Sequence, residues 1–549
     1  MRVDINYKTT KNGKTNYSYL LREAYRGANG KNQHKTIANL SDYDYDEVKA
    51  LQWALKNLDK IQQIKDDPNV TYKSLYHYAS VYVPYVIAQR LGIVKALGNT
   101  PTGKRMLWEV ISRLIYPTSK LGSVRLAQNH AALEVLNMSP FNEDDIYGGL
   151  EWLEGKQQQI ENHLFKQREE VTNLYLYDVT SAYLEGVKNE LGAYGYDRDN
   201  KKGKQQIVVG LLTDETGNPL SVEVFEGNTQ DLSTFHNQLE KIKQRFNSDS
   251  IIIVGDKGML KKPQQKGIEK EGCYYITGIT KAQIKSMLGQ GAFQMSLFDE
   301  NVKEVKGNDN ERYVLRRNPV RAGEIQKTRS EKEEKVRQYL YKQNAYLRDH
   351  PQAEVSAAYK RLKQKIGRLK VAGWLSVNQD EERRKLSLEK DEEAMAEESK
   401  LDGCYVIKSD VPQEVASAQQ LHDRYKDLGY VEQAFRSFKS DYMQIRPVYV
   451  TNEISTRAHV FIVMLSYMIE RELAKCWRNE NLTVREGIGN LAKITILRIQ
   501  KGKETPFCII PEGDETTQRL LDHVNIKLPP TVKPRKNEVY TRKTLKNKP

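Results

Sequence analysis

Two strand-like stretches of this chain each end in an aspartate, and this feature constrains the fold most. The first stretch is Leu174-Tyr-Leu-Tyr-Asp178, and the second is the apolar run Ser250-Ile-Ile-Ile-Val-Gly-Asp256, which is typical of a strand buried on both faces. A carboxylate at the end of a buried strand is unfavourable unless a cation, a metal ion or solvent compensates its charge. For either aspartate alone, an exposed strand end is the better interpretation.

The segment between the two aspartates predicts that they share one end of a sheet. Gln206–Thr213 and Leu220–Glu226 flank a turn-rich stretch and are predicted to form a hairpin, followed by a helix over Leu232–Phe246. In a β-β-β-α-β arrangement the first and fourth strands can lie side by side. Asp178 and Asp256 would then present two hard oxygen ligands, which suit Mg²⁺ or Mn²⁺.

A third carboxylate lies on a long helix predicted from Val415 to about Asp441. Tyr425, Glu432 and Lys439 follow one another at intervals of seven residues, so they share one helix face. A solvated charged face is the alternative interpretation. Apolar residues on the same helix indicate that it also packs against a core: Val431, Ala434, Phe435 and Phe438.

The helical motif resembles that of bacterial insertion-sequence transposases with an RNase H-like core and an Asp-Asp-Glu (DDE) metal site. The resemblance is to the group with the signature Tyr-x2-Arg-x3-Glu-x6-Lys. Tyr425, Glu432 and Lys439 match its spacing, whereas Leu428 occupies the arginine position. Arg436, one turn beyond Glu432, is a candidate to replace that arginine as a phosphate contact.

The motifs around both aspartates resemble the same group. They are Tyr177-Asp-Val-Thr-Ser181 and Val254-Gly-Asp-Lys-Gly-Met259, where lysine follows the aspartate although a small residue or arginine is more usual. The stretch Gly192-Ala-Tyr-Gly-Tyr-Asp197 is similar too. The resemblance spans about residues 80–475, and three motifs in the same order make it specific.

The resemblance implies an α/β fold with an RNase H-like mixed sheet flanked by helices and interrupted by a large insertion. It implies a transposase that cleaves DNA at the ends of an insertion sequence and transfers the strands to a target. Asp178, Asp256 and Glu432 would be the catalytic residues and would hold two Mg²⁺ ions, with Mn²⁺ as a substitute. The partner would be double-stranded DNA, bound by a homodimer, and four residues would contact it: Tyr425, Arg436, Lys439 and Arg446.

The pattern of strand-like, helical and charged segments changes several times along the chain, which predicts separate regions. Two Asn-Gly turns near the N-terminus predict a β-meander, and the charged middle segment lies between similar strand starts at Gly272–Gly278 and Gly403–Ser409, although that similarity could be chance. The predicted regions are 1–70 (β-meander and helix), 71–170 (helical, a DNA-binding domain), 171–280 (catalytic core, first part), 281–401 (charged, largely helical insertion), 402–475 (catalytic core, second part) and 476–549 (C-terminal region with a basic tail, flexible from Thr531).

Several helices follow from apolar periodicity and flanking prolines. Trp374, within the predicted insertion, either stacks on a displaced base or, by the stronger expectation, packs the insertion's own small core. The main predicted helices are Asp46–Asp66, Val83–Leu97, Lys104–Tyr116, Ser330–Leu347, Ala353–Leu369 and Ile454–Lys475.

Composition agrees with a polyanionic partner but does not require one. The 549 residues carry a formal net charge of +14, which suits nucleic acid as well as a merely basic soluble protein. The four cysteines stand far apart without a C-x-x-C pair, which argues against a cysteine zinc site and suits a reducing cytoplasm. No apolar run is long enough for a membrane span or a signal peptide, so we expect a cytoplasmic, nucleoid-associated protein.

Two other functions remain as alternatives. A DNA-binding relative with an inactive core is one, although all three carboxylates are present. A phosphatase of the aspartyl-phosphate type is the other, and it is disfavoured because Thr180 stands where those enzymes place a second aspartate. The sequence leaves open the terminal repeat, the target preference and whether cleavage proceeds through a DNA hairpin.

Overall fold

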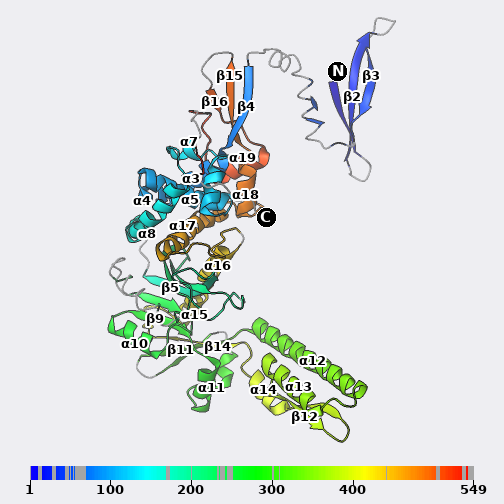
Figure 1. Ribbon diagram of the computed structural model, residues 1–549, viewed down its shortest axis with the longest axis vertical. Coiled ribbons are helices and arrows are strands. Elements are labelled where there is room, and N and C mark those ends of the chain that lie inside the picture. The colour runs from blue at the N-terminus through cyan, green and yellow to red at the C-terminus, as the bar shows by residue number, and fades with distance from the viewer. Residues whose placement is uncertain are drawn as a thin grey trace.

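The structure is a computed structural model (Figure 1). It describes residues 2–9, 15–26, 32–41, 43, 48–49, 51–52, 55, 70–168, 173–199, 201–230, 234, 242–243, 251–299, 302–307, 310–440, 442–501, 507–533 and 539–541. Most of the predicted helices at Asp46–Asp66 and Leu232–Phe246 lie outside these residues. Among the described residues, no helix is both long enough and apolar enough to cross a membrane.

An eight-stranded mixed sheet forms the centre of the molecule, with the order β10-β11-β14-β9-β8-β5-β6-β7. Strand β5 pairs antiparallel with β6 and parallel with β8, so the first and fourth strands of the predicted unit lie side by side. This confirms the RNase H-like mixed sheet. Its strands are β5 (Leu174–Tyr183), β6 (Gln206–Asp214), β7 (Pro219–Glu226), β8 (Ile252–Gly255), β9 (Tyr274–Gly278), β10 (Lys303–Lys306), β11 (Arg312–Arg317) and β14 (Cys404–Ser409).

Helices cover both faces of this sheet, and the alternation of side chains along β5 explains why. Leu174 and Leu176 enter the largest hydrophobic core, whereas Tyr175 and Tyr177 enter a second core on the opposite face. The larger core includes side chains of α8 (Glu143–Lys166), α16 (Leu428–Lys439) and α17 (Glu453–Cys476). The smaller core includes Ile268 of α10 (Lys262–Lys270).

Two of the predicted helices are each divided in the structure. The helix predicted from Val415 to Asp441 consists of α15 (Ala418–Lys426) and α16, which meet at Asp427. The backbone of Asp427 stays right-handed, with φ −61° and ψ −16°, so the break is local. The helix predicted at Val83–Leu97 consists of α3 (Ala79–Arg90) and α4 (Ile93–Leu97), because Gly92 adopts a φ of +78° that ends a helix.

The predicted insertion leaves the sheet at β9 and returns at β14, and these two strands are antiparallel neighbours. Trp374 is 2% exposed within a separate small core, as expected from the sequence. One difference is that β10 and β11 extend the central sheet instead of belonging to the helical part. That part projects from one end of the sheet (Figure 1) and contains α12 (Pro319–Asp349), α13 (Val355–Leu369), β12 (Leu375–Asp380), β13 (Lys385–Lys390) and α14 (Glu392–Ser399); the insertion also contains α11 (Lys281–Gly289) and the 3-10 helix η1 (Met295–Phe298).

The N-terminal meander is confirmed as a three-stranded antiparallel sheet. A helical region follows β4. Its helix α5 ends at Ile115, directly before Tyr116 and Pro117, which is close to the predicted end of this helix at Tyr116. The bounds are β1 (Arg2–Thr9), β2 (Thr15–Arg26), β3 (Asn32–Asn39), β4 (Val70–His77), α5 (Pro101–Ile115), α6 (Lys120–Ala127) and α7 (Ala132–Leu136).

The C-terminal region pairs with the beginning of the helical region, which the sequence did not predict. Strand β15 pairs with β4, and the tail supplies β17, so the tail is ordered at Thr531–Val532. Val539 is buried, and its carbonyl accepts a hydrogen bond from Gln128 Nε2 at 3.0 Å. The expectation of a flexible tail from Thr531 was wrong for these residues. The remaining bounds are α18 (Val484–Leu491), β15 (Thr495–Lys501), β16 (Phe507–Ile509), α19 (Glu515–His523) and β17 (Thr531–Val532).

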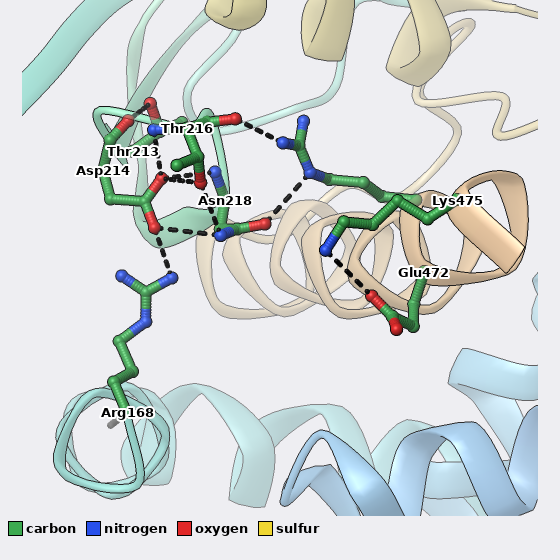
Figure 2. A network of polar contacts seen from close by, with 8 residues as sticks. Arg168, Thr213, Asp214, Thr216, Asn218, Glu472 and Lys475 are labelled. Atoms are coloured by element: carbon green, nitrogen blue, oxygen red, sulfur yellow. Dashed lines mark hydrogen bonds and ion pairs between the residues drawn. The ribbon is translucent and has the colours of Figure 1, made fainter. Parts of the chain in front are cut away.

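The turn between β6 and β7 is tied to the surrounding helices by a polar network (Figure 2). Asp214 Oδ1 accepts hydrogen bonds from the backbone N–H groups of Thr216 and Asn218, at 2.9 and 2.8 Å. Arg168, just after α8, donates to Asp214 Oδ2 at 2.6 Å, and Arg471 of α17 donates to Asn218 Oδ1 at 3.0 Å. These contacts fasten the hairpin end of the sheet to two helices.

Candidate active site

The register of the sheet brings the two predicted aspartates together. In the parallel pair, Tyr177 lies opposite Gly255. The next residue on each side is an aspartate: Asp178 within β5 and Asp256 directly after β8. Parallel neighbours lie about 4.8 Å apart across a sheet. The two carboxylates therefore lie side by side at the carboxyl end of β8. The prediction that the first strand ends at Asp178 was wrong, because β5 continues to Tyr183 and pairs with β6 along its whole length.

Helix α16 brings the third carboxylate to this end of the sheet. Its buried side contacts β5, and Glu432 lies on its exposed side. All three carboxylates, Asp178, Asp256 and Glu432, line one cavity of about 650 Å³. Four cations also line it: Arg198, Arg436, Lys439 and Arg446.

The negative charges of Asp256 and Glu432 act electrostatically on Asp178. Burial, together with the negative charges of Asp256 and Glu432, raises the pKa of Asp178 to about 7, although a backbone hydrogen bond from Val179 and the charge of Arg198 oppose this shift. No three His, Cys, Asp or Glu side chains among the described residues lie close enough to enclose a metal ion as they stand. The arrangement is thus a group of repelling carboxylates around a shared space.

Tyr425 connects the end of α15 to this group. Its hydroxyl donates to Asp256 Oδ1 at 3.5 Å, and burial, followed by the charge of Asp256, raises its pKa. Tyr425 remains protonated at any ordinary pH, so it acts here as a hydrogen-bond donor. Glycine is required nearby, because a Cβ at Gly278 would lie 2.5 Å from the Tyr425 hydroxyl oxygen.

Two of the predicted DNA contacts are held by an aspartate that the sequence analysis did not single out. Lys439 Nζ and Arg446 Nη1 lie 2.8 and 2.5 Å from Asp199 Oδ1. The Asp199 side chain is 2% exposed and also accepts the backbone N–H of Tyr183 at 3.2 Å. The motif ending in Asp197 stops two residues short of it, and no spacing in the sequence links it to Lys439.

The family comparisons agree with this geometry. Residues 170–469 match the family described as the transposase DDE domain, which is more than half of the chain. This chain belongs to the DDE transposase family. Residues 5–69 match the N-terminal domain of IS1634 family transposases, so the transposase is of an insertion-sequence type.

Comparisons with individual proteins add little to the family match. One solved structure of a synaptic complex of piggyBac transposase with hairpin DNA is similar at 8% identity and a TM-score of 0.37, over 75% of this chain and 80% of that chain. A likeness this distant supports no conclusion about the site. No curated protein matches the chain.

The transposase has a leucine at the arginine position of the family signature, and Arg436 is the candidate to replace that arginine. Leu428, at the arginine position, is 9% exposed and belongs to the main core, so it faces away from the cavity. Arg436 is exposed and lines the cavity. Arg436 is therefore better placed than residue 428 to contact a phosphate.

Proposed function

We propose that this transposase cleaves DNA strands at the ends of its insertion sequence and joins them to target DNA in a reaction that requires divalent metal ions. The observation that carries the proposal is the set of three coupled carboxylates in one cavity lined by cations. Carboxylates in this arrangement repel one another unless positive charge lies between them. An inactive DNA-binding relative would have no need to retain all three.

The donor set fits Mg²⁺, or Mn²⁺ as a substitute, because all three side chains supply hard oxygen atoms. Asp178, Asp256 and Glu432 would hold two ions. When bound, such ions supply Lewis acidity at the phosphodiester and favour ionisation of the attacking hydroxyl. The raised pKa of Asp178 fits this role, since metal binding favours the ionised carboxylate that the metal-free site disfavours.

The remaining residues of the site would position the DNA. Tyr425 would keep Asp256 oriented through its hydroxyl. Arg436, Lys439 and Arg446 would hold phosphates of double-stranded DNA beside the carboxylates, with Asp199 fixing the last two cations in place. A homodimer would bind the two ends of the insertion sequence together.

Glu432→Gln is the decisive test. Glutamine has nearly the same size and helix propensity, so the variant should fold and bind DNA while strand cleavage in Mg²⁺ falls at least about 1,000-fold. The matched control is Glu414→Gln, the same change at an exposed position before α15, which should cleave like the wild type. DNA carrying the terminal sequence that flanks the gene is the substrate.

The outcomes separate the candidate functions. Cleavage by Glu432→Gln at the wild-type rate would remove this residue from the site and contradict the proposed set of three carboxylates. A wild-type protein that binds the ends but cleaves in neither Mg²⁺ nor Mn²⁺ would favour the DNA-binding relative.

A further inference from the structure

A second cavity lies on the other side of the loop that joins β8 to α10. Successive residues of this loop face opposite ways: Asp256 and Met259 line the catalytic cavity, whereas Lys257, Leu260 and Lys261 line the second one. The second cavity has a volume of about 780 Å³. A single loop of the chain thus separates the two spaces.

Tyr425 forms part of the same partition. Gly278 lines the second cavity, and the close approach of the Tyr425 hydroxyl to this glycine places the cavity directly behind the tyrosine. The same hydroxyl reaches Asp256 on the catalytic side. A molecule in the second cavity would therefore lie next to one bound at the carboxylates.

The wall of this cavity carries an excess of positive charge. Lys408 is buried and neutralised, with its Nζ 2.5 Å from Glu311 Oε1. Lys257, Lys261 and Lys262 are exposed. Among the described residues, the side chains of Lys257 and Lys261 have no hydrogen-bond or ion-pair partner, whereas the charge of Lys262 acts on Glu311. Two ammonium groups without a described partner, with Lys262 close by, favour a polyanionic ligand in this cavity.

We propose that this cavity is a phosphate subsite that holds the DNA backbone beside the phosphodiester at the carboxylates. The inference rests on the proposed function and extends it to three lysines that the family signature does not include. Lysine binds phosphate as a point charge, and such backbone contacts position DNA without reading its sequence. Tyr313 also lines the cavity, and its hydroxyl donates a hydrogen bond to Glu311 at 2.6 Å.

The test compares two double variants with the same change in charge. Lys257→Gln/Lys261→Gln removes two ammonium groups from the cavity. Lys266→Gln/Lys285→Gln removes two exposed ones from α10 and α11 that do not line it. DNA binding is measured without metal over a series of salt concentrations, with a duplex of the terminal sequence and its flank as the probe.

The cavity variant should bind more weakly at low salt, and its log K against log salt should be less steep by about 1 to 2, since each phosphate contact contributes about 0.9. The control variant should keep the wild-type slope. The proposal would be overturned if the wild type and both double variants had equal salt slopes, both with the terminal duplex and with an unrelated plasmid as the probe.

The backbone could belong to the insertion-sequence end or to the target, and two further arms separate them. Ethylation of phosphates next to the cleavage site should weaken wild-type binding but not cavity-variant binding if the end occupies the subsite. If the target occupies it, the salt slope should fall with an unrelated plasmid as the probe, and the cavity variant should cleave normally but join pre-cleaved ends to that plasmid poorly. Metal-free binding is measured apart from cleavage, so an inactive wild-type protein would refute the proposed function without deciding the subsite.

Discussion

Asp178 occupies an unfavourable environment for an ionised carboxylate as long as no cation is present. Its pKa of about 7 exceeds its ordinary value of 3.8, so the folded state keeps a proton that the unfolded state loses between these two values. The metal-free protein therefore loses stability as pH rises from about 4 to 7, and the loss is complete above pH 7. A bound cation would remove this penalty.

Mg²⁺ should consequently stabilise the wild type and have little effect on Asp178→Asn. Binding at a concentration of one hundred times Kd adds about 2.7 kcal/mol, which differential scanning fluorimetry at pH 8, with and without a chelator, would detect as a higher Tm. Without metal, Asp178→Asn should melt above the wild type at pH 8. A variant that responds to Mg²⁺ as the wild type does would contradict the assignment of Asp178 as a metal ligand.

At the scale of elements, the β6–β7 turn supports α16, the helix that carries Glu432. Gly217 has a φ of +82°, and a Cβ there would lie 2.5 Å from Tyr430 Cβ. Tyr430 precedes Glu432 by two residues in α16. The turn network of Asp214 fixes this close approach.

Gly217→Ala should therefore destabilise the fold by about 2–4 kcal/mol and also slow cleavage, because both strain and a displaced α16 contribute. Gly291→Ala is the control: Gly291 has a φ of +73° but open space around it, so it should lose only about 1 kcal/mol. Urea denaturation gives both values. If both variants lose the same free energy of unfolding, the contact of residue 217 with Tyr430 does not add to the effect of the substitution.

Helix α17 carries a second carboxylate with an unfavourable environment. Burial raises the pKa of Glu470 to about 7, with Arg471 opposing the effect. The folded state therefore binds more protons than the unfolded state between about pH 4.5 and 7, and stability falls with rising pH across this window. Glu470 does not line the catalytic cavity.

Glu470→Gln should accordingly raise the free energy of unfolding at pH 8 by about 1–3 kcal/mol and leave it nearly unchanged at pH 4. Cleavage should remain at the wild-type level. Denaturation curves at the two pH values test the first expectation. If the difference in free energy of unfolding between Glu470→Gln and the wild type is the same at pH 4 and at pH 8, solvent reaches this carboxylate.

At the scale of the whole molecule, the first and last parts of the chain stabilise one another. Strand β15 pairs with β4 from Thr495 to Lys501, and Trp477 donates a hydrogen bond to the carbonyl of Leu520 at 3.0 Å. Helix α18 contacts both α3 and α5. The predicted region 476–549 is thus packed against the predicted region 71–170; the region boundaries themselves remain predictions.

Two truncations test this dependence. A chain that ends at Thr541 keeps β17 and the buried Val539, and it should melt within a few degrees of the full chain. A chain that ends at Cys476 leaves β4 without a partner and exposes apolar surface of α3 and α5, so it should aggregate or lose its cooperative transition. Circular dichroism melting distinguishes the two, and a stable, cooperative Cys476 truncation would show that the C-terminal region is dispensable.

The sequence by itself determined the parts of this protein whose pattern is local. Apolar strands that carry Asp178 and Asp256, with a hairpin between them, were enough to predict that β5 and β8 are neighbours. The motifs around these aspartates and the spacing of Tyr425, Glu432 and Lys439 carried the resemblance that implied the RNase H-like sheet. Side-chain periodicity reports which face of a strand or helix is buried, so each of these features is visible within a few turns of chain.

Only the tertiary structure decided how distant segments meet. The pairing of β4 with β15, the position of Asp199 between Lys439 and Arg446, and the lysine cavity behind Tyr425 all join residues far apart in the chain. Such contacts satisfy buried backbone groups and charges wherever the folded chain brings them together. Because that requirement sets no spacing between the partners, the sequence carries no periodic signal for it.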